Sequence, residues 1–225
     1  MYLVKTPPLV QNLFPRFMWR MNKTVATPQQ QKVLYLTFDD GPIPEVTPWV
    51  LQQLARFNAK ATFFCVGENV CKNTKIFNDV LDAGHSVGNH TYNHRNGWAT
   101  PLHDYLDNVA QCAAFVPSNL FRPPYGRLSP KQSQALHKEY SIVMWDVLSG
   151  DFDANLSPIN CFQNVVKHTQ AGSILLFHDS IKASRNLFYA LPRVLAHFSE
   201  LGYVFQALPM QNNNIATNHT LALAY

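Results

Sequence analysis

The sequence lacks several features that would place it in a familiar class of protein. It has no run of about 18 apolar residues, so no membrane-spanning helix is predicted. Its 18 basic and 14 acidic residues are scattered, and no basic run interleaved with aromatic residues indicates binding to nucleic acid. Its four cysteines form no Cys-x-x-Cys pair, which favours free and mostly buried thiols.

The first 30 residues also lack the continuous apolar stretch of a signal peptide, because prolines and amides at positions 7–12 interrupt it. This absence favours a cytoplasmic protein. What the chain does have is length and apolar content: 225 residues, 47% hydrophobic and only 14% charged, fit one large domain with a sizeable core. We therefore predict an N-terminal extension over residues 1–30 and a single domain over residues 31–225.

Short β-rich runs alternate with amphipathic helical segments along most of the chain. Strands are predicted at residues 33–38, 61–66, 86–90, 120–122, 141–145, 173–177 and 203–207. Helices are predicted at residues 47–57, 74–83, 103–116, 129–138, 158–170 and 185–200. Because such alternation joins parallel strands through crossover helices, it predicts an α/β fold, either an open doubly wound sheet or an incomplete barrel.

Polar residues follow five of these strands, each time at the carboxyl end. They are the pair Asp39 and Asp40, the pair His90 and His94, then Arg122, Asp151 and His178. In an open sheet, loops far apart along the edge cannot converge, whereas a closed sheet brings every carboxyl-end loop around one mouth. The sequence therefore favours an incomplete (β/α) barrel of about seven parallel strands.

The two histidines are four residues apart, a spacing that can place both imidazoles on one metal ion. Taken alone, His90 and His94 are better explained as surface or hydrogen-bonded residues of an asparagine-rich loop. An acidic residue, Asp40, is predicted at the same mouth, and it completes a set of two imidazoles and one carboxylate that leaves coordination positions open. We predict one divalent metal ion there, with zinc preferred, although the same ligands suit cobalt, nickel or iron.

The adjacent carboxylates Asp39 and Asp40 can divide the work of a hydrolytic site, one binding the metal and the other accepting a proton from water. The alternative is a turn, since Asp before Gly-Pro commonly bonds the following backbone. Arg122 is either an exposed residue of a stiff Pro-Pro loop or a partner that holds Asp39 through a charge-assisted hydrogen bond. The backbone N–H of Tyr125, in the same loop, can face an oxyanion.

His178 follows an apolar strand and is either a core histidine satisfied by a neighbour such as Asp179 or a general acid. At the mouth of a barrel, opposite the metal, its imidazolium could protonate the amine that leaves when an amide is cleaved. Asp151 would orient His178 and raise its pKa, because a nearby negative charge favours the imidazolium.

In order and spacing these segments resemble the motifs of the polysaccharide deacetylase family, the carbohydrate esterases of family four. The segments are Thr37-Phe-Asp-Asp-Gly-Pro42, His90-Thr-Tyr-Asn-His94, Arg122-Pro-Pro-Tyr-Gly126, Asp151-Phe152 and Leu175-Leu-Phe-His-Asp179, within roughly residues 33–207. The resemblance implies a distorted seven-stranded (β/α) barrel, and it makes residues 31–225 the catalytic domain.

The resemblance also implies roles for individual residues. Asp39 would be the base and Asp40 the metal ligand. Arg122 would hold Asp39, and the backbone N–H of Tyr125 would face the oxyanion. Phe152 stands where the family usually has Trp, which keeps an apolar wall possible but puts the specific sugar contact of an indole in question.

The expected activity is that of a metal-dependent hydrolase that removes N-acetyl groups from the amino sugars of a glycan or oligosaccharide and releases acetate. Two alternatives stay open: hydrolysis of a non-sugar amide C–N bond on the same fold, and carbohydrate binding without catalysis. Asp39 and His178 argue against the second, because binding alone needs neither a base nor an acid. A substrate in the cell envelope, which the resemblance implies, would place the protein there rather than in the cytoplasm.

Overall fold

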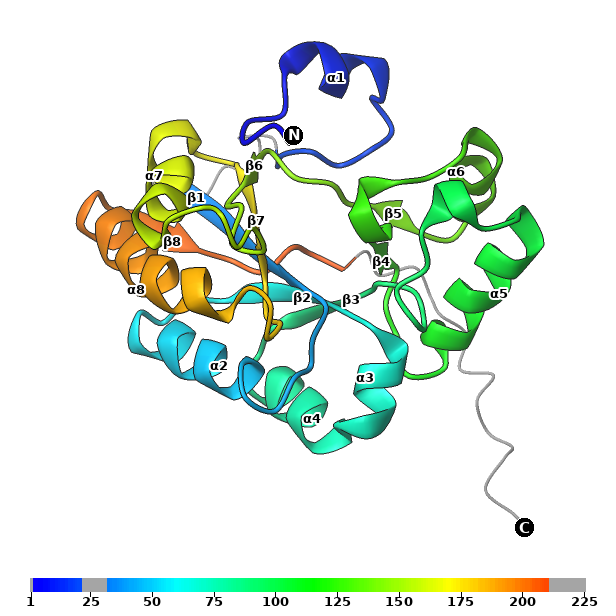
Figure 1. The fold of residues 1–225 in the computed structure, drawn as a ribbon, viewed down its shortest axis with the longest axis horizontal. Helices are drawn as coiled ribbons and strands as arrows, with labels where there is room; N and C mark the ends of the chain where they lie inside the picture. The colour runs from blue at the N-terminus through cyan, green and yellow to red at the C-terminus, as the bar shows by residue number, and fades with distance from the viewer. Residues whose placement is uncertain (1, 22–31, 211–225) are drawn as a thin grey trace.

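The computed structural model describes residues 2–21 and 32–210 and contains one curled parallel sheet (Figure 1). Its strands are β1 (Lys32–Asp39), β2 (Ala61–Cys65), β3 (Ser86–Asn89), β4 (Leu120–Phe121), β5 (Ser141–Ile142), β6 (Val147–Leu148), β7 (Ile174–His178) and β8 (Tyr203–Phe205). Their order is β5-β4-β3-β2-β1-β7-β6, with β8 pairing the first residues of β1, and every pair is parallel. The distorted, incomplete barrel predicted from the sequence is confirmed, with β5 and β6 as its two edges.

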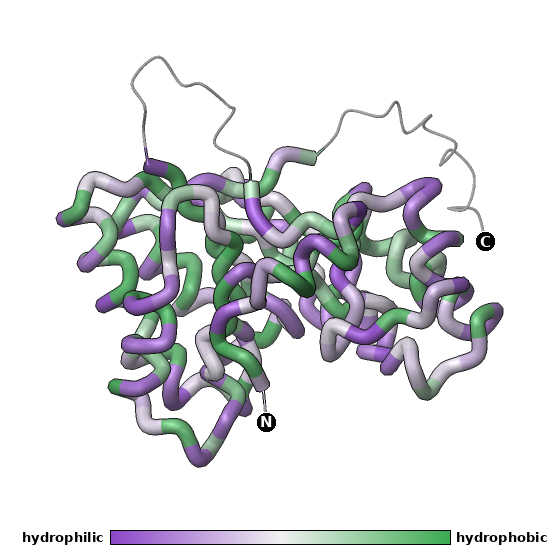
Figure 2. The backbone as a smooth tube through the Cα atoms, turned by 90° about the horizontal axis from the view of Figure 1, so that it is seen from above, coloured by the Kyte–Doolittle hydropathy of each residue, from purple (hydrophilic) through white to green (hydrophobic). Residues whose placement is uncertain are grey.

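Helices cover the outside of the sheet, with α2, α4, α7 and α8 toward the left and lower part of the view and α5 and α6 toward the right (Figure 1). The helices are α1 (Pro8–Leu13), α2 (Thr47–Arg56), α3 (Gly67–Lys72), α4 (Thr74–Asp82), α5 (Leu102–Ala113), α6 (Pro130–Leu136), α7 (Pro158–His168) and α8 (Ser184–Glu200), with 3-10 turns η1 (Gly97–Ala99) and η2 (Pro124–Gly126). In Figure 2 the outer helices alternate between hydrophobic and hydrophilic segments, as expected of helices that bury one face.

The core lies between the central strands and the helices that cover them. Every residue of β2 and all but the first two residues of β1 are buried, as expected for parallel strands covered on both faces. The Phe38 ring stacks on Phe63 of β2 (5.1 Å between centroids) and on Phe177 of β7 (6.1 Å). This packing fixes the three central strands, so the loops at their carboxyl ends stand on a rigid scaffold.

One stretch of the chain departs from its prediction. The strand predicted at residues 141–145 ends at Ile142, and a further short strand, β6, follows it. The fully buried carboxylate of Asp146 separates the two strands. As a correction, Asp151 follows β6 rather than the predicted fifth strand. Periodicity also missed α1 and α3, because six residues are too few to show it.

Residues 2–21 lie across the seam between β5 and β6, the two edges of the sheet (Figure 1). Lys5 forms an antiparallel bridge to β6, and Met18 forms a parallel bridge just after β5. The backbone N–H of Met18 donates to the Ile142 carbonyl, and its carbonyl accepts from the Met144 N–H, both at 2.8 Å. The N-terminal segment therefore pairs with both edges, whose backbone donors and acceptors would otherwise lack strand partners.

A buried carboxylate ties this segment to the barrel. Asp146 Oδ2 lies 2.7 Å from Lys5 Nζ and 3.4 Å from Arg20 Nε, and both cations belong to the N-terminal segment. The Asp146 carboxylate also accepts hydrogen bonds from Ser173 Oγ (2.5 Å) and Gln11 Nε2 (3.2 Å). Because a buried carboxylate needs charged or hydrogen-bonding partners, the N-terminal segment and the barrel stabilise each other here.

We expect Asp146→Asn to lower the free energy of unfolding by about 2 kcal/mol, because Lys5 and Arg20 lose their carboxylate. This value is below that for a fully buried pair, since both cations are 28% exposed and are screened by water. Urea unfolding measures the change. As a control, Asp79→Asn breaks an exposed pair with Lys75 and should cost less than about 0.5 kcal/mol. Equally small effects in both variants would contradict the role given to Asp146.

Candidate active site

The end of β1 carries the two adjacent carboxylates, and a third carboxylate holds the loop that follows them. Asp39 is the buried last residue of β1, whereas Asp40 adopts a positive φ of 87°. The Asp179 side chain accepts hydrogen bonds from the Gly41 N–H (3.0 Å) and the Thr47 hydroxyl (2.6 Å). A Cβ atom at Gly41 would clash with the Asp179 carboxylate, so the close approach requires glycine. Asp179 therefore positions the turn after β1, a role that sequence reasoning missed.

Asp40, His90 and His94 each bring one potential ligand atom to a common point. These three atoms all lie within 4.8 Å of one another. His94 Nε2 is 3.2 Å and His90 Nε2 is 3.8 Å from Asp40 Oδ1. The other ring nitrogens have partners behind them: His90 Nδ1 lies 2.7 Å from the Arg122 carbonyl, and His94 Nδ1 lies 3.2 Å from the Tyr125 hydroxyl. Such outer partners orient the Nε2 atoms toward the point where a metal would bind.

These three residues fit a divalent cation. Asp40 Oδ1 is buried, and it faces the Nε2 atoms of His94 and His90, so one carboxylate oxygen and two ring nitrogens point to the same place. Burial lowers the pKa of His90 to about 4, which keeps its imidazole neutral, the form that binds a metal. Burial alone would raise the pKa of Asp40, but the neighbouring histidines, His94 first, hold it below its ordinary value. An ionised carboxylate and a neutral imidazole are the donors that metal binding requires.

Arg122 is fully buried and binds Asp39, so the alternative of an exposed loop residue is wrong. Its Nη1 donates to Asp39 Oδ1 (2.7 Å) and to Thr37 Oγ1 (2.8 Å). Its Nη2 donates to the Met144 carbonyl (2.8 Å), and the guanidinium carbon lies 4.1 Å from the centre of the Phe64 ring. Because these partners come from separate parts of the chain, they fix the guanidinium, which in turn fixes one carboxylate oxygen of Asp39.

His178 binds Asp151 rather than Asp179, so the alternative of a histidine satisfied by Asp179 is wrong as well. The His178 Nδ1 atom lies 2.8 Å from Asp151 Oδ1, and the His178 backbone N–H donates to Oδ2 (2.7 Å). Burial disfavours the imidazolium, but the charge and hydrogen bond of Asp151 outweigh it and raise the pKa of His178 to about 9. His178 is therefore protonated at neutral pH.

The loop after Asp151 is packed from two sides. Phe152 meets the His178 ring edge-on at 5.3 Å between centroids, so an apolar wall is present there. Tyr2 packs on Phe152 at 5.2 Å, and its hydroxyl donates to Asp153 (3.1 Å). The N-terminal segment thus supports the loop that carries the partner of His178. Sequence reasoning missed this contact, because Tyr2 and Asp153 are 151 residues apart and no local pattern connects them.

Tyr125 lies beside the candidate metal ligands, in η2, with a positive φ of 60°. Its ring meets the His94 ring edge-on at 4.7 Å, and the side chain is 61% exposed. A hollow of about 470 Å³ opens here, lined in part by His94, Thr100 and Tyr125. The sequence pointed to the backbone of Tyr125 and missed its side chain. Its role at an oxyanion stays a prediction.

The mouth of the incomplete barrel therefore holds the parts of a hydrolytic site: paired carboxylates, three residues that fit a cation, and a protonated histidine. Comparison with known proteins agrees with this class. The sequence profile of the family described as polysaccharide deacetylase matches residues 26–143. A peptidoglycan-N-acetylglucosamine deacetylase of Bacillus cereus is 35% identical over 189 residues, which cover 81% of this chain and 89% of that protein. This chain belongs to the polysaccharide deacetylase family.

Solved structures share the fold. The crystal structure of the Bc1960 peptidoglycan N-acetylglucosamine deacetylase in complex with 4-naphthalen-1-yl-N-oxidanyl-benzamide matches with a TM-score of 0.79 at 27% identity, covering 91% of this chain and 96% of that one. A family 4 carbohydrate esterase from Streptomyces lividans in complex with acetate matches with a TM-score of 0.71 at 28% identity, covering 80% and 95%. Fold and family membership together make this chain a hydrolase of the deacetylase type.

Proposed function

We propose that this protein is a metal-dependent hydrolase that removes N-acetyl groups from the amino sugars of a peptidoglycan-like glycan and releases acetate. The observation that carries the proposal is the convergence of Asp39, fixed by Arg122, with the candidate metal ligands and the paired His178 and Asp151 at one mouth. Relatives named as peptidoglycan N-acetylglucosamine deacetylases support the substrate class. The bond cleaved would be the amide C–N bond of the acetamido group.

Asp40, His90 and His94 would hold one divalent cation, with zinc preferred and with cobalt, nickel or iron also suited to these ligand types. When bound, the cation would polarise the acetyl carbonyl and make water more acidic. Asp39 accepts the proton that water loses as the water oxygen attacks the carbonyl carbon. The charge-assisted hydrogen bond from Arg122 keeps Asp39 oriented for this step.

The remaining steps use residues on the other side of the mouth. As the acetyl oxygen gains negative charge, the backbone N–H of Tyr125 would donate a hydrogen bond to it. His178 gives a proton to the amide nitrogen, the C–N bond breaks, and acetate and a free amino sugar leave. Asp151 holds the His178 ring through Nδ1, so the proton that is donated is the one on Nε2.

The two alternative functions have less support. A non-sugar amide would undergo the same chemistry, but the family and the relatives are named for polysaccharide and peptidoglycan. A binding protein without catalysis would not need Asp39 and His178 each paired to a charged partner at the mouth. No helix among the described residues is long and apolar enough to cross a bilayer. Because a peptidoglycan-like substrate belongs to the cell wall, we include the cell envelope in the proposal as the place of action.

Metal content tests the three candidate ligands. We expect His90→Ala and His94→Ala to lose more than about 100-fold in metal affinity, since even the loss of an outer partner costs about 10- to 100-fold. Elemental analysis measures the metal that the purified variants retain, which should fall steeply. His103→Ala is the control, because that histidine is exposed and pairs with Asp107 away from the site. Unchanged metal content in both ligand variants would reject the ligand set.

Acetate release tests the activity itself. The substrates are chitooligosaccharides, peptidoglycan fragments and acetylated xylan, each with and without added zinc, cobalt, nickel or iron. We expect metal-dependent release from the substrates that carry N-acetyl groups and little release from the O-acetylated xylan. The absence of acetate from every substrate with every metal would reject the proposed function.

A further inference from the structure

An exposed aromatic side chain stands beside the candidate active site and has no part in the mechanism above. Trp98 is 68% exposed, although its indole N–H donates to the Leu128 carbonyl (3.1 Å). The Arg127 guanidinium lies 5.0 Å from the centre of the Trp98 ring. An aromatic ring that is exposed to water and yet anchored at its polar end offers its face to a ligand.

The loop that carries Trp98 is held rigidly by a buried amide. Gln132 is 1% exposed, and its Nε2 donates to the Gly97 carbonyl (2.9 Å) and the Thr100 carbonyl (3.0 Å), one on each side of Trp98. A Cβ atom at Gly97 would lie 2.3 Å from the Arg127 carbonyl oxygen, so this loop and the loop after η2 are in close contact. Trp98 and Arg127 are therefore positioned before any ligand arrives, which reduces the entropy cost of binding.

Contacts connect this pair directly to the candidate metal ligands. The Arg127 guanidinium also lies 5.9 Å from the centre of the Tyr125 ring, and the Tyr125 hydroxyl is 3.2 Å from His94 Nδ1. The hollow of about 470 Å³ is lined by His94, Tyr125 and Ala99, the residue after Trp98, whereas Trp98 itself lines a separate hollow of about 590 Å³ with Leu128. Through Tyr125 and Ala99, Trp98 and Arg127 thus lie within reach of the unit next to one whose acetamido group meets the metal ligands.

Exposed cations stand at this hollow and close to it. Arg95 and Arg127 are both exposed, and neither lies within 4.0 Å of a carboxylate of any described residue. Across the mouth, Lys182 lies over the Phe152 ring at 5.8 Å, again without a carboxylate partner in the described part of the chain. Cations that no internal carboxylate neutralises favour a ligand that carries a negative charge.

We infer that Trp98 and Arg127 form a subsite for the sugar unit next to the one that is deacetylated, and that this neighbouring unit carries a carboxylate. The inference rests on the proposed function and specifies its substrate as an acidic glycan. The apolar face of a pyranose ring packs on the indole, and the guanidinium forms charge-assisted hydrogen bonds with the carboxylate. A neutral glycan would keep only the first of these two contacts.

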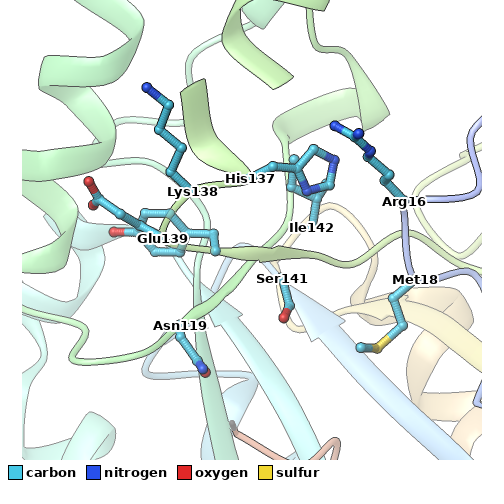
Figure 3. Close-up of a pocket in the computed structure, with 9 residues that line it drawn as sticks. Arg16, Met18, Asn119, His137, Lys138, Glu139, Ser141 and Ile142 are labelled. Carbon is cyan, nitrogen blue, oxygen red and sulfur yellow. The ribbon is translucent and has the colours of Figure 1, made fainter. Parts of the chain in front are cut away.

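A hollow on another part of the surface, which includes basic side chains, supplies a control. Figure 3 shows Arg16, His137 and Lys138 around a hollow of about 300 Å³ that also includes Ser141. Ser141 is the first residue of β5, so this hollow lies at the amino ends of the strands, away from the mouth. Removal of the Lys138 charge therefore changes the net charge of the protein by the same amount as removal of the Arg127 charge, without touching the proposed subsite.

The experiment compares kcat/KM for acetate release from peptidoglycan oligosaccharides before and after amidation of their carboxylates. We expect Arg127→Gln to lower kcat/KM about 10-fold on the acidic fragments, mainly by raising KM. On the amidated fragments the same variant should lower kcat/KM by no more than about twofold. Trp98→Ala should lower kcat/KM about 10-fold on both, and Trp98→Phe should restore most of it. Lys138→Gln, and Ile159→Ala at an exposed apolar position of α7, should stay within about twofold of the unaltered protein.

Equal losses on acidic and amidated fragments for Arg127→Gln would overturn the assignment of an acidic unit. Unchanged kinetics for Trp98→Ala would overturn the subsite. Dissociation constants of the same fragments, measured by calorimetry on the same variants, test the subsite even where no acetate forms. If no acetate forms but Arg127→Gln still weakens the binding of acidic fragments more than that of amidated ones, the result would count against the proposed function and support the subsite.

Discussion

Replacement of Asp39 by Asn is expected to lower turnover about 10²- to 10⁴-fold while the metal content stays unchanged. Asn keeps the shape of the side chain but cannot accept the proton that water loses during attack. Asp39 is outside the set of three candidate ligands, and its hydrogen bond comes from Arg122 Nη1 at 2.7 Å. Steady-state kinetics of acetate release and elemental analysis of the same preparation measure the two effects.

The control for this variant must separate lost chemistry from lost folding, because the fully buried Arg122 loses its charged partner. Thr37→Val is suitable, since it removes the other acceptor of Arg122 Nη1 and leaves Asp39 in place. We expect both variants to unfold at lower urea concentration, but Thr37→Val to keep turnover within about 10-fold. If Asp39→Asn also kept turnover within that range, Asp39 would not be the base.

A change at Asp151 should appear in the pH profile. Asp151→Asn is expected to move the alkaline limb of the kcat/KM profile to lower pH by about one to three units. His178 must be protonated to donate, so activity falls as the pH rises through its pKa. Burial works against the imidazolium, and Asp151 outweighs that effect and raises the pKa to about 9. Without the carboxylate the pKa falls, and activity is lost at lower pH.

Two further variants show whether this shift comes from His178 and from the Asp151 carboxylate in particular. His178→Ala should lower turnover about 10²-fold or more at every pH, because it removes the acid itself. Asp153→Asn is the matched control, since that carboxylate lies in the same loop but accepts its hydrogen bond from Tyr2. Its alkaline limb should stay in place. An alkaline limb that stays fixed, or moves to higher pH, in Asp151→Asn would show that Asp151 does not set the protonation of His178.

Much of the fold follows from local patterns in the sequence. The apolar run of β1, the capping box of Ser129 and Gln132 at the start of α6, and the alternation of strands with helices are readable without tertiary information. The placement of Asp39, His90 and His178 at one mouth is also predictable. Each follows or ends a parallel strand, and the carboxyl ends of parallel strands lie on the same side of a sheet.

The edges of the sheet were harder to predict. β5 and β6 have two residues each, which is too short to show alternation. Asp146 lies between them and is buried, although a charged residue is normally predicted to be exposed. Residues 2–21 look peripheral in the sequence because few of them follow a regular pattern. Their bridges to both edges depend on backbone pairing between segments more than 100 residues apart, as for Lys5 and Val147.

The kinds of side chain in the site, and the strand that presents each of them, follow from the sequence because a strand end and its loop are local features. The partners of these side chains depend on the tertiary fold. Side chains alternate between the two sides as a strand ends, so His178, the last residue of β7, reaches Asp151, while Asp179, just after it, turns to Gly41 and Thr47. Which side faces which neighbour depends on the register and packing of segments that are distant in the chain, and local periodicity does not encode that.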